Sequence, residues 1–271
     1  MKKKKILLTG STGFLGNEIF KFLNKKYECG SITRDNLRSN KKLEEVILKK
    51  LPDVIVNAAS IVGLSKSNIN QTETKKINSR LPYNLAKFSK QFNFHLIHIS
   101  TQSIFDGNIK NDLYENTEPN PFSFYGYTKY LGEKNVTHNT DNFTILRFPY
   151  IYSNNLKNPR NVLSKIFSDI NNGSVNILKK ERSSMISVQS AVKTIDDVII
   201  NNSKGIFHAS DIGTFDWFEL IEFVSKVLKK KTKINFEDIE KRKKYTVLKS
   251  LNCFYGYNSW KNGVRDALKI K

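Results

Sequence analysis

Short apolar runs alternate with stretches whose apolar residues recur at helical spacing along the first two thirds of the chain. Apolar runs bounded by polar or glycine-rich segments are typical of strands buried in a parallel sheet. We expect such strands at 4–9, 27–33, 52–57, 94–99, 144–146 and 205–209. We expect helices at 17–23, 41–50, 75–91 and in a segment that contains Tyr125. The alternation predicts an α/β fold built on a doubly wound parallel sheet (Rossmann fold), whose ligands bind at the carboxyl ends of the strands.

The regular alternation ends near residue 154. Beyond it the pattern indicates helices at 161–170, 188–201 and 216–229 and a short strand at 175–178. We therefore divide the chain into a Rossmann domain over 1–150, to which 188–212 returns, and a smaller C-terminal α/β part over 151–271.

Composition limits the class of protein. The chain has 271 residues, 39% of them hydrophobic, which is enough to bury a substantial core. No apolar run approaches the roughly 20 residues of a membrane-spanning helix. Cys29 and Cys253 are too few and too isolated for a disulfide framework or a zinc site. We therefore expect a cytoplasmic protein without a metal site.

The net charge of +20 is the most unusual bulk property of the chain. A nucleic-acid-binding protein concentrates its basic residues on one element and interleaves aromatic residues with them. Here lysines are spread over nearly every segment, with small clusters at 2–5, 229–233 and 241–244. We interpret most of this charge as solvated surface that attracts anionic ligands, and we expect neither nucleic acid nor membrane insertion.

A glycine-rich turn follows the first predicted strand and precedes the first predicted helix. Its glycines, Gly10, Gly13 and Gly16, differ by one residue in spacing from the Gly-x-Gly-x-x-Gly fingerprint of dinucleotide-binding folds. Such glycines permit a tight turn and close approach of a pyrophosphate to the helix N-terminus. The flanking strand and helix favour a dinucleotide site over a glycine-rich loop without a ligand.

Arg34 follows the second predicted strand, where a βαβ unit meets the adenosine ribose of its cofactor. An acidic residue there binds the 2′-hydroxyl of NAD, whereas an arginine accommodates the 2′-phosphate of NADP. Asp35 comes next, so both cofactors stay open, as does an exposed loop arginine without a ligand. We favour NADP because Arg34 comes first and Arg38 can assist.

Tyr125 and Lys129 stand four residues apart, which places both side chains on one face of a helix, one turn apart. A nearby ammonium favours the phenolate and draws the phenol pKa towards the range in which it exchanges protons with a carbonyl or alcohol. The spacing also arises by chance in a chain rich in both residues, and a tyrosine ring packed on a lysine stem is the structural alternative. Other residues expected at the same sheet edge are Asn57 and Thr101.

Four motifs in the same order as in a known family decide between these alternatives. They are Thr9-Gly10-x-x-Gly13-x-x-Gly16, the stretch 52–59, Ser100-Thr101-x-x-Ile104-Phe105-Asp106-Gly107, and Pro121-x-x-x-Tyr125-Gly126-x-x-Lys129-x-x-Gly132-Glu133. With them the chain resembles an extended short-chain dehydrogenase/reductase, and within that superfamily a sugar-nucleotide reductase of the dTDP-4-dehydrorhamnose reductase type.

The resemblance implies a role for each matching residue. Tyr125 is similar to the family's proton donor, Lys129 to its pKa partner and ribose anchor, and Thr101 to the hydroxyl that polarises the carbonyl. The implied cofactor contacts are Gly10, Thr12, Gly13, Phe14, Leu15, Gly16, Arg34, Asn36, Leu37, Asn57, Ala58, Ala59, Ser100, Tyr125 and Lys129.

The substrate side departs from the family pattern. Gln102-Ser103 stands where Asp-Tyr is usual, and Arg242-Lys243 stands where Arg-Pro is usual. We keep Ser103, Phe105 and Arg242 as expected substrate contacts, with Arg242 as a bidentate phosphate partner. These departures leave the identity of the sugar open.

The resemblance implies NADP-dependent reduction of a 4-keto-6-deoxyhexose nucleotide, a step in making precursors of cell-surface polysaccharide. A nucleotide-sugar epimerase or dehydratase on the same scaffold is the first alternative. A non-catalytic nucleotide-binding regulatory subunit is the second, because function resides in the site and not in the fold. The expected partner is the nucleotide-sugar, and the expectation includes a homodimer.

Overall fold

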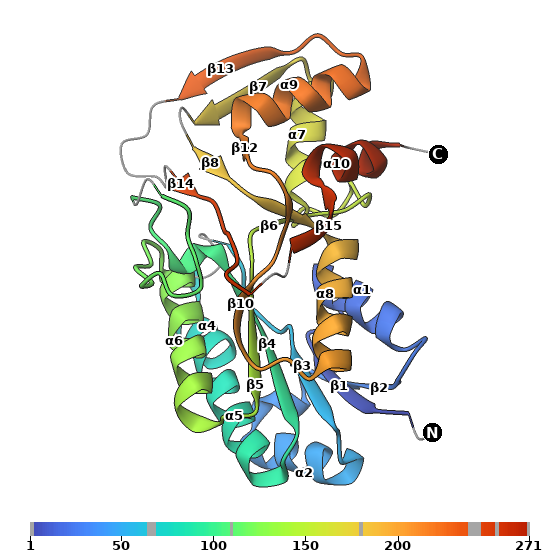
Figure 1. Ribbon diagram of the computed structural model, residues 1–271, viewed down its shortest axis with the longest axis vertical. Coiled ribbons are helices and arrows are strands. Elements are labelled where there is room, and N and C mark those ends of the chain that lie inside the picture. The colour runs from blue at the N-terminus through green and yellow to red at the C-terminus, as the bar shows by residue number, and fades with distance from the viewer. Residues whose placement is uncertain are drawn as a thin grey trace. The chain divides into compact units, whose positions relative to one another are not determined.

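The computed structural model describes residues 3–63, 69–108, 111–178, 181–237, 245–252 and 255–269 (Figure 1). The chain forms two compact units. The first unit comprises Met1–Ile104, Pro119–Arg147 and Val192–Phe207, and the second comprises Phe105–Glu118, Phe148–Ala191 and His208–Lys271.

A six-stranded parallel sheet forms the centre of the first unit, as the apolar runs predict. Its strands are β1 (Lys5–Thr9), β2 (Glu28–Ile32), β3 (Val54–Asn57), β4 (His95–Thr101), β5 (Phe143–Phe148) and β10 (Gly205–His208). The order is β10-β5-β4-β3-β1-β2, so the direction of winding reverses between β1 and β3. In doubly wound sheets ligands bind at this switch point, outside the carboxyl ends of the strands.

Helices cover both faces of this sheet (Figure 1). They are α1 (Phe14–Leu23), α2 (Asn40–Lys50), α4 (Gln71–Lys75), α5 (Leu81–Phe92), α6 (Phe124–Asn139) and α8 (Val188–Asn201). Figure 1 draws α1 and α8 on one face and α5 and α6 on the other. Leu7, Ile55, Leu96 and Leu85 belong to the core between the sheet and its helices, and each is almost wholly buried.

The predicted helix at 75–91 is interrupted by a π-helical turn, η2 (Lys76–Arg80). The turn buries the Asn78 side chain, whose amide oxygen accepts from the Ile61 N–H at 2.9 Å. The Asn78 carbonyl oxygen lies 2.3 Å from where a Cβ on Gly132 would stand. The spacing of apolar residues does not reveal this turn, because tertiary contacts to Ile61 and α6 stabilise it.

The second unit contains small sheets and three helices in its described part. The strands pair as β6 (Tyr150–Tyr152) with β9 (Met185–Ser187), β7 (Ser174–Leu178) with β13 (Lys233–Glu237), β11 (Ser210–Ile212) with β15 (Tyr255–Ser259), and β8 (Arg182–Ser183) with both β12 (Phe215–Asp216) and β14 (Tyr245–Thr246). The helices are α7 (Val162–Asn171), α9 (Trp217–Leu228) and α10 (Trp260–Leu268). The sequence pattern predicts α7, α9 and β7 but misses α10 and the short strands. The short strands contain too few residues to display a period.

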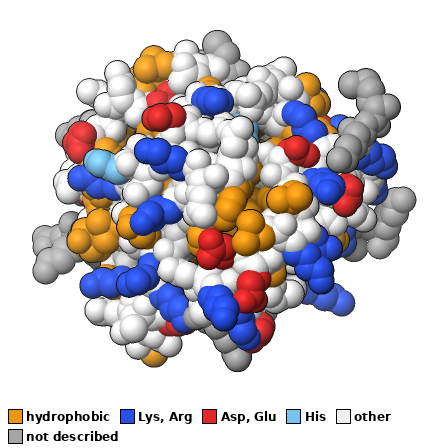
Figure 2. All heavy atoms as spheres, turned by 90° about the horizontal axis from the view of Figure 1, so that it is seen from below, with side chains coloured by type: hydrophobic (Ala, Val, Ile, Leu, Met, Phe, Trp, Pro, Cys, Tyr) orange, Lys and Arg blue, Asp and Glu red, His pale blue; other side chains and the backbone are white. Residues whose placement is uncertain are grey.

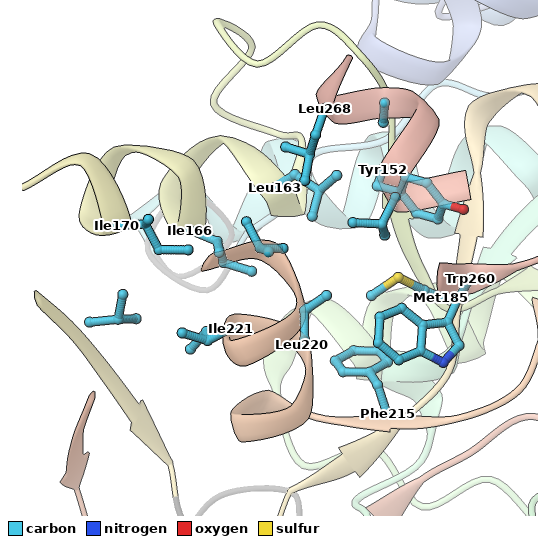
Figure 3. Close-up of a cluster of buried hydrophobic side chains, with 14 of the residues drawn as sticks. Tyr152, Leu163, Ile166, Ile170, Met185, Phe215, Leu220, Ile221, Trp260 and Leu268 are labelled. Atoms are coloured by element: carbon cyan, nitrogen blue, oxygen red, sulfur yellow. The ribbon is translucent and has the colours of Figure 1, made fainter. Parts of the chain in front are cut away.

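The core of the second unit packs helices α7, α9 and α10 around aromatic side chains (Figure 3). Phe215 lies edge-on to Trp217 and is tilted against Trp260. Tyr152 is wholly buried, and its hydroxyl donates to Asp211 at 2.6 Å. A Cβ on Gly263 would lie 1.9 Å from that hydroxyl, so α10 needs a glycine where it crosses Tyr152.

Charge is dispersed over the surface that Figure 2 shows, where Lys and Arg side chains stand in small groups among acidic, apolar and uncharged ones. Several lysines are paired locally, for example Lys42 with Asp35 at 2.9 Å. Among the described residues, no helix combines the length and apolar character that crossing a membrane requires.

Candidate functional site

The glycine-rich turn leaves β1 at the switch point and packs tightly against the loop after β3. Gly10 has φ +71°, and a Cβ there would lie 2.7 Å from the Ala59 nitrogen. A Cβ on Gly16 would lie 2.1 Å from the Gly10 carbonyl oxygen. Gly13 caps α1 without a side chain, and the first turn of α1 contains no acidic residue. The backbone thus forms a cradle at a helix N-terminus, as a pyrophosphate requires.

A short 3₁₀ turn, η1 (Asn36–Arg38), follows β2 at the expected adenosine end. The Asn36 side-chain oxygen accepts from both the N–H and the hydroxyl of Thr33, at 2.9 and 2.7 Å, which fixes this turn. Arg34 is exposed beside it. The Asp35 carboxylate is paired with Lys42, whereas no ion pair of Arg34 is found among the described residues.

A hollow of about 340 Å³ lies next to this turn in the first unit. Leu37, Leu43 and Leu81 supply apolar walls. Lys76 and Arg80 bring basic side chains from η2 to the same hollow. Leu37, one of the expected cofactor contacts, therefore lines a hollow in which apolar side chains can pack against a flat ring close to positive charge.

Tyr125, Thr101 and Ser60 form a hydrogen-bonded group at the carboxyl end of β4. The Tyr125 hydroxyl has side-chain hydrogen bonds to Thr101 and to Ser60. The Thr101 hydroxyl oxygen also accepts from the Ser103 N–H at 3.1 Å. Desolvation raises the pKa of Tyr125 above its ordinary value, and the two hydrogen bonds oppose this rise. The expected lowering of this pKa by Lys129 is therefore wrong for the protein by itself.

Lys129 is itself buried and hydrogen-bonded to β4. Its side chain is 2% exposed, and its Nζ donates to the Ile99 carbonyl oxygen at 2.6 Å. Burial lowers the pKa of Lys129 to about 8, against the opposing effect of Glu133. Near neutral pH a smaller fraction of Lys129 is therefore in the ammonium form than is usual for an exposed lysine.

A buried ion pair stabilises the part of α6 around Lys129. Arg147 Nη2 lies 2.7 Å from Glu133 Oε2, and both side chains are 3% exposed. The Ser100 hydroxyl also donates to Glu133. The pair therefore ties α6 to β4 and β5 next to Lys129, and sequence reasoning assigned Glu133 no role.

A second group that sequence reasoning missed surrounds His98 on β4. Its ring Nδ1 lies 3.0 Å from Asn57 Nδ2, and its Nε2 lies 3.4 Å from Lys129 Nζ. Asn57, an expected cofactor contact, is 1% exposed and faces the sheet core. The sequence signal was a histidine two residues before Ser100 in a largely apolar strand that also contains His95.

The three expected substrate contacts have different environments. Ser103 lies in the 3₁₀ turn η3 (Gln102–Ile104), and a Cβ on Gly126 would lie 2.0 Å from its carbonyl oxygen. Phe105 belongs to the second unit, where it is 2% exposed and lies edge-on to His208. Arg242 lies outside the described residues. The structure thus brings together Thr101, Tyr125 and Lys129, and the substrate contacts stay predictions.

Comparisons with known proteins agree with this arrangement. Residues 4–250 match the family model described as RmlD substrate binding domain. A dTDP-4-keto-6-deoxy-D-glucose reductase from Streptomyces niveus is 24% identical over 227 residues, covering 82% of this chain and 78% of that relative. The fold is that of the dTDP-4-dehydrorhamnose reductase from Bacillus anthracis solved in complex with NADP, with a TM-score of 0.89, 22% identity and 98% of each chain covered.

A relative of another kind matches a shorter part of the chain. The methionine adenosyltransferase 2 subunit beta from Bos taurus is 31% identical over 160 residues. The match covers 55% of this chain and 47% of that relative, so it spans about half of the subunit's length.

Proposed function

Since the chain belongs to the RmlD substrate binding domain family, we propose that it reduces the 4-keto group of a 4-keto-6-deoxyhexose nucleotide with NADPH. The observation that carries this proposal is the joint position of Thr101, Tyr125 and Lys129 at the carboxyl end of β4. The same unit contains the glycine cradle at the N-terminus of α1. Proton donor and glycine cradle therefore belong to one compact unit.

The nicotinamide, when bound, supplies the hydride for the carbonyl carbon. Tyr125 gives its proton to the carbonyl oxygen as negative charge develops there. The Thr101 hydroxyl, already bonded to Tyr125, orients the same oxygen. Lys129 in its ammonium form stabilises the phenolate that remains. Because the pKa of Tyr125 is raised in the free protein, the residue starts the reaction protonated, as a donor must.

We assign NADP rather than NAD to the cradle because Arg34 is exposed after β2, whereas Asp35 is paired with Lys42. A guanidinium can bind a 2′-phosphate through two parallel hydrogen bonds. The Bacillus anthracis reductase of the same fold binds NADP in its solved structure. NAD is the alternative cofactor.

The two units would have different roles in the reaction. The first unit would bind the cofactor, and the second would supply contacts to the nucleotide-sugar, Arg242 among them. The product would serve polysaccharide synthesis in the cytoplasm, and the enzyme would act alone or as a homodimer. A similar bacterial protein, the spore coat polysaccharide biosynthesis protein SpsK of Bacillus subtilis, bears a name that fits this setting.

A regulatory subunit is the second candidate, because half of the chain is similar to methionine adenosyltransferase 2 subunit beta. The complete Thr101, Tyr125 and Lys129 set favours an enzyme over that role, since a pure binding subunit has no need of a proton donor. An epimerase or dehydratase keeps its nicotinamide bound and consumes none of it overall.

The test is NADPH consumption with a panel of dTDP- and UDP-linked 4-keto-6-deoxyhexoses, with the product identified by NMR. Consumption of one equivalent per reduced sugar supports the proposal, and Tyr125→Phe serves as the inactive control. A sugar product formed without net loss of NADPH would identify the epimerase or dehydratase. Cofactor binding without any sugar conversion would favour the regulatory subunit.

A further inference from the structure

A buried chain of hydrogen bonds runs from the cofactor edge of the sheet to Lys129. It begins at the Ala59 N–H, which donates to the Thr9 hydroxyl oxygen at 3.1 Å. The Thr9 hydroxyl then donates to Asn57 Oδ1 at 2.6 Å. A backbone N–H can only donate, so the single hydroxyl proton of Thr9 is left for Asn57. The direction of the chain is therefore set from its first member.

The direction continues through Asn57 to His98. Since the atom of Asn57 that accepts from Thr9 is its oxygen, the atom that faces His98 Nδ1 at 3.0 Å is the amide nitrogen, a donor. His98 is wholly buried, and burial holds its pKa well below the ordinary value, with Lys129 contributing in the same sense. The ring is therefore neutral at pH 7, and a neutral ring with an accepting Nδ1 has its proton on Nε2.

Nε2 of His98 lies 3.4 Å from Lys129 Nζ. An N–H that faces an ammonium is donor against donor, whereas the same N–H can bond to the lone pair of a neutral amine. We propose that His98 is a positioning residue that holds its Nε2–H against Lys129 Nζ, and that it favours the neutral amine over the ammonium. It thereby sets the alkaline limit of the reaction.

Helix α6 lies close to the His98 ring. A Cβ on Gly132 of α6 would lie 3.4 Å from His98 Nε2, so the helix passes directly over the ring. Lys129 meanwhile keeps its hydrogen bond to the Ile99 carbonyl oxygen. The Asn57 amide thus holds the Nδ1 side of the His98 ring, and the Ile99 carbonyl oxygen holds Lys129 Nζ.

The other titratable groups around Lys129 come from α6 and β5. Glu133, one turn further along α6, favours the ammonium, but it is itself held by Arg147 of β5 and by Ser100 of β4. Tyr125 on α6 is bonded to Thr101 and Ser60. Of the groups named, His98 is the one that presents a fixed neutral donor to Nζ.

The chain also links Lys129 to the cofactor cradle. Ala59, whose N–H begins the chain, also lines the cradle, since a Cβ on Gly10 would lie 2.7 Å from the Ala59 nitrogen. The ionisation of Lys129 therefore depends on hydrogen bonds made by residues of β1 and β3, and these two strands pair at the switch point. This role of His98 deepens the proposed reductase function and rests on it wherever activity is the readout.

Two replacements of His98 distinguish the roles of its two ring nitrogens. His98→Asn places a side-chain amide near the position of Nδ1 that cannot reach Lys129, whereas His98→Gln places a donor near the position of Nε2. His95→Asn is the matched control, because His95 is a buried histidine of the same strand whose Nε2 contacts Thr144 at 2.8 Å instead.

We expect His98→Asn to move the alkaline limb of the kcat profile upwards by about half to one pH unit, the scale of one lost hydrogen-bonding contact. His98→Gln and His95→Asn should leave that limb in place. An unmoved limb in His98→Asn, or a shift downwards, would overturn the proposal, because a downward shift means that His98 accepts from Lys129.

A second readout needs no activity. Long-range ¹H–¹⁵N correlation spectra of the histidine-labelled protein distinguish a protonated ring nitrogen from a bare one, and His98→Gln identifies the signal. We expect a bare Nδ1 and a protonated Nε2 at pH 7. The opposite tautomer or a doubly protonated ring refutes the assignment. If no sugar is reduced, the proposed function fails while this spectrum still decides the role of His98.

Discussion

Replacing Arg147 by Met should destabilise the first unit strongly. The guanidinium makes three contacts of 2.7–3.1 Å to Glu133, and both side chains are 3% exposed. Without Arg147 the carboxylate stays buried, with the Ser100 hydroxyl still donating to it. Breaking a buried pair from one side costs about 3–5 kcal/mol, because an uncompensated charge remains in a low-dielectric site.

The double variant Arg147→Met with Glu133→Leu gives the sharper test. Removing both charges abolishes the desolvation cost on each side, so apolar replacements of similar volume should recover most of the lost stability, to within about 1–2 kcal/mol of the parent. The measured coupling between the two sites should then be at least about 2 kcal/mol. Additive losses in the double variant would mean that the pair is not the unit that stabilises this region.

Urea unfolding followed by two probes locates the effect. Both tryptophans, Trp217 and Trp260, belong to the second unit, so fluorescence reports on that unit. Far-UV circular dichroism reports on the helices of both units. The single variant should lower the midpoint seen by circular dichroism more than the midpoint seen by fluorescence. A larger fluorescence shift would contradict the assignment of the damage to the first unit.

Three further predictions concern the site. Tyr125→Phe should lower turnover by about 10²-fold or more with little change in cofactor affinity, and steady-state kinetics with full activity retained would refute the mechanism. Arg34→Ala should weaken NADPH binding and leave NADH binding nearly unchanged in calorimetry, and an equal loss for both cofactors would make Arg34 structural. Arg242→Ala should raise the substrate KM roughly ten- to a hundredfold and leave the KM for NADPH in place. An equal, salt-screened effect of Lys241→Ala would remove Arg242 from the site.

The sheet and the glycine turn were predictable because their causes are local. The apolar run before Thr9 and the glycines after it determine a strand and a tight turn from a few consecutive residues. Tyr125 and Lys129 were found the same way, since one helical turn connects them. The pKa of Tyr125 was not, because it depends on burial and on partners, Ser60 and Thr101, that are distant in sequence.

The second unit was harder to predict for a related physical reason. Its strands β8, β12 and β14 have two residues each and are stabilised by pairing with segments far along the chain. Such strands leave no period in the sequence, and their register is fixed by tertiary contacts. The helix α10 was missed because it is short and polar on its outer face, although Ser259 caps it through a bond to the Asn262 N–H.

The arrangement at Lys129 also changes how the familiar Tyr-x-x-x-Lys spacing should be understood in this chain. The spacing alone suggests that a fixed ammonium activates the tyrosine, but here burial lowers the pKa of Lys129 to about 8 and raises that of Tyr125. A negatively charged cofactor bound beside Lys129 would favour its ammonium form, so that cofactor binding itself completes the proton-donating site.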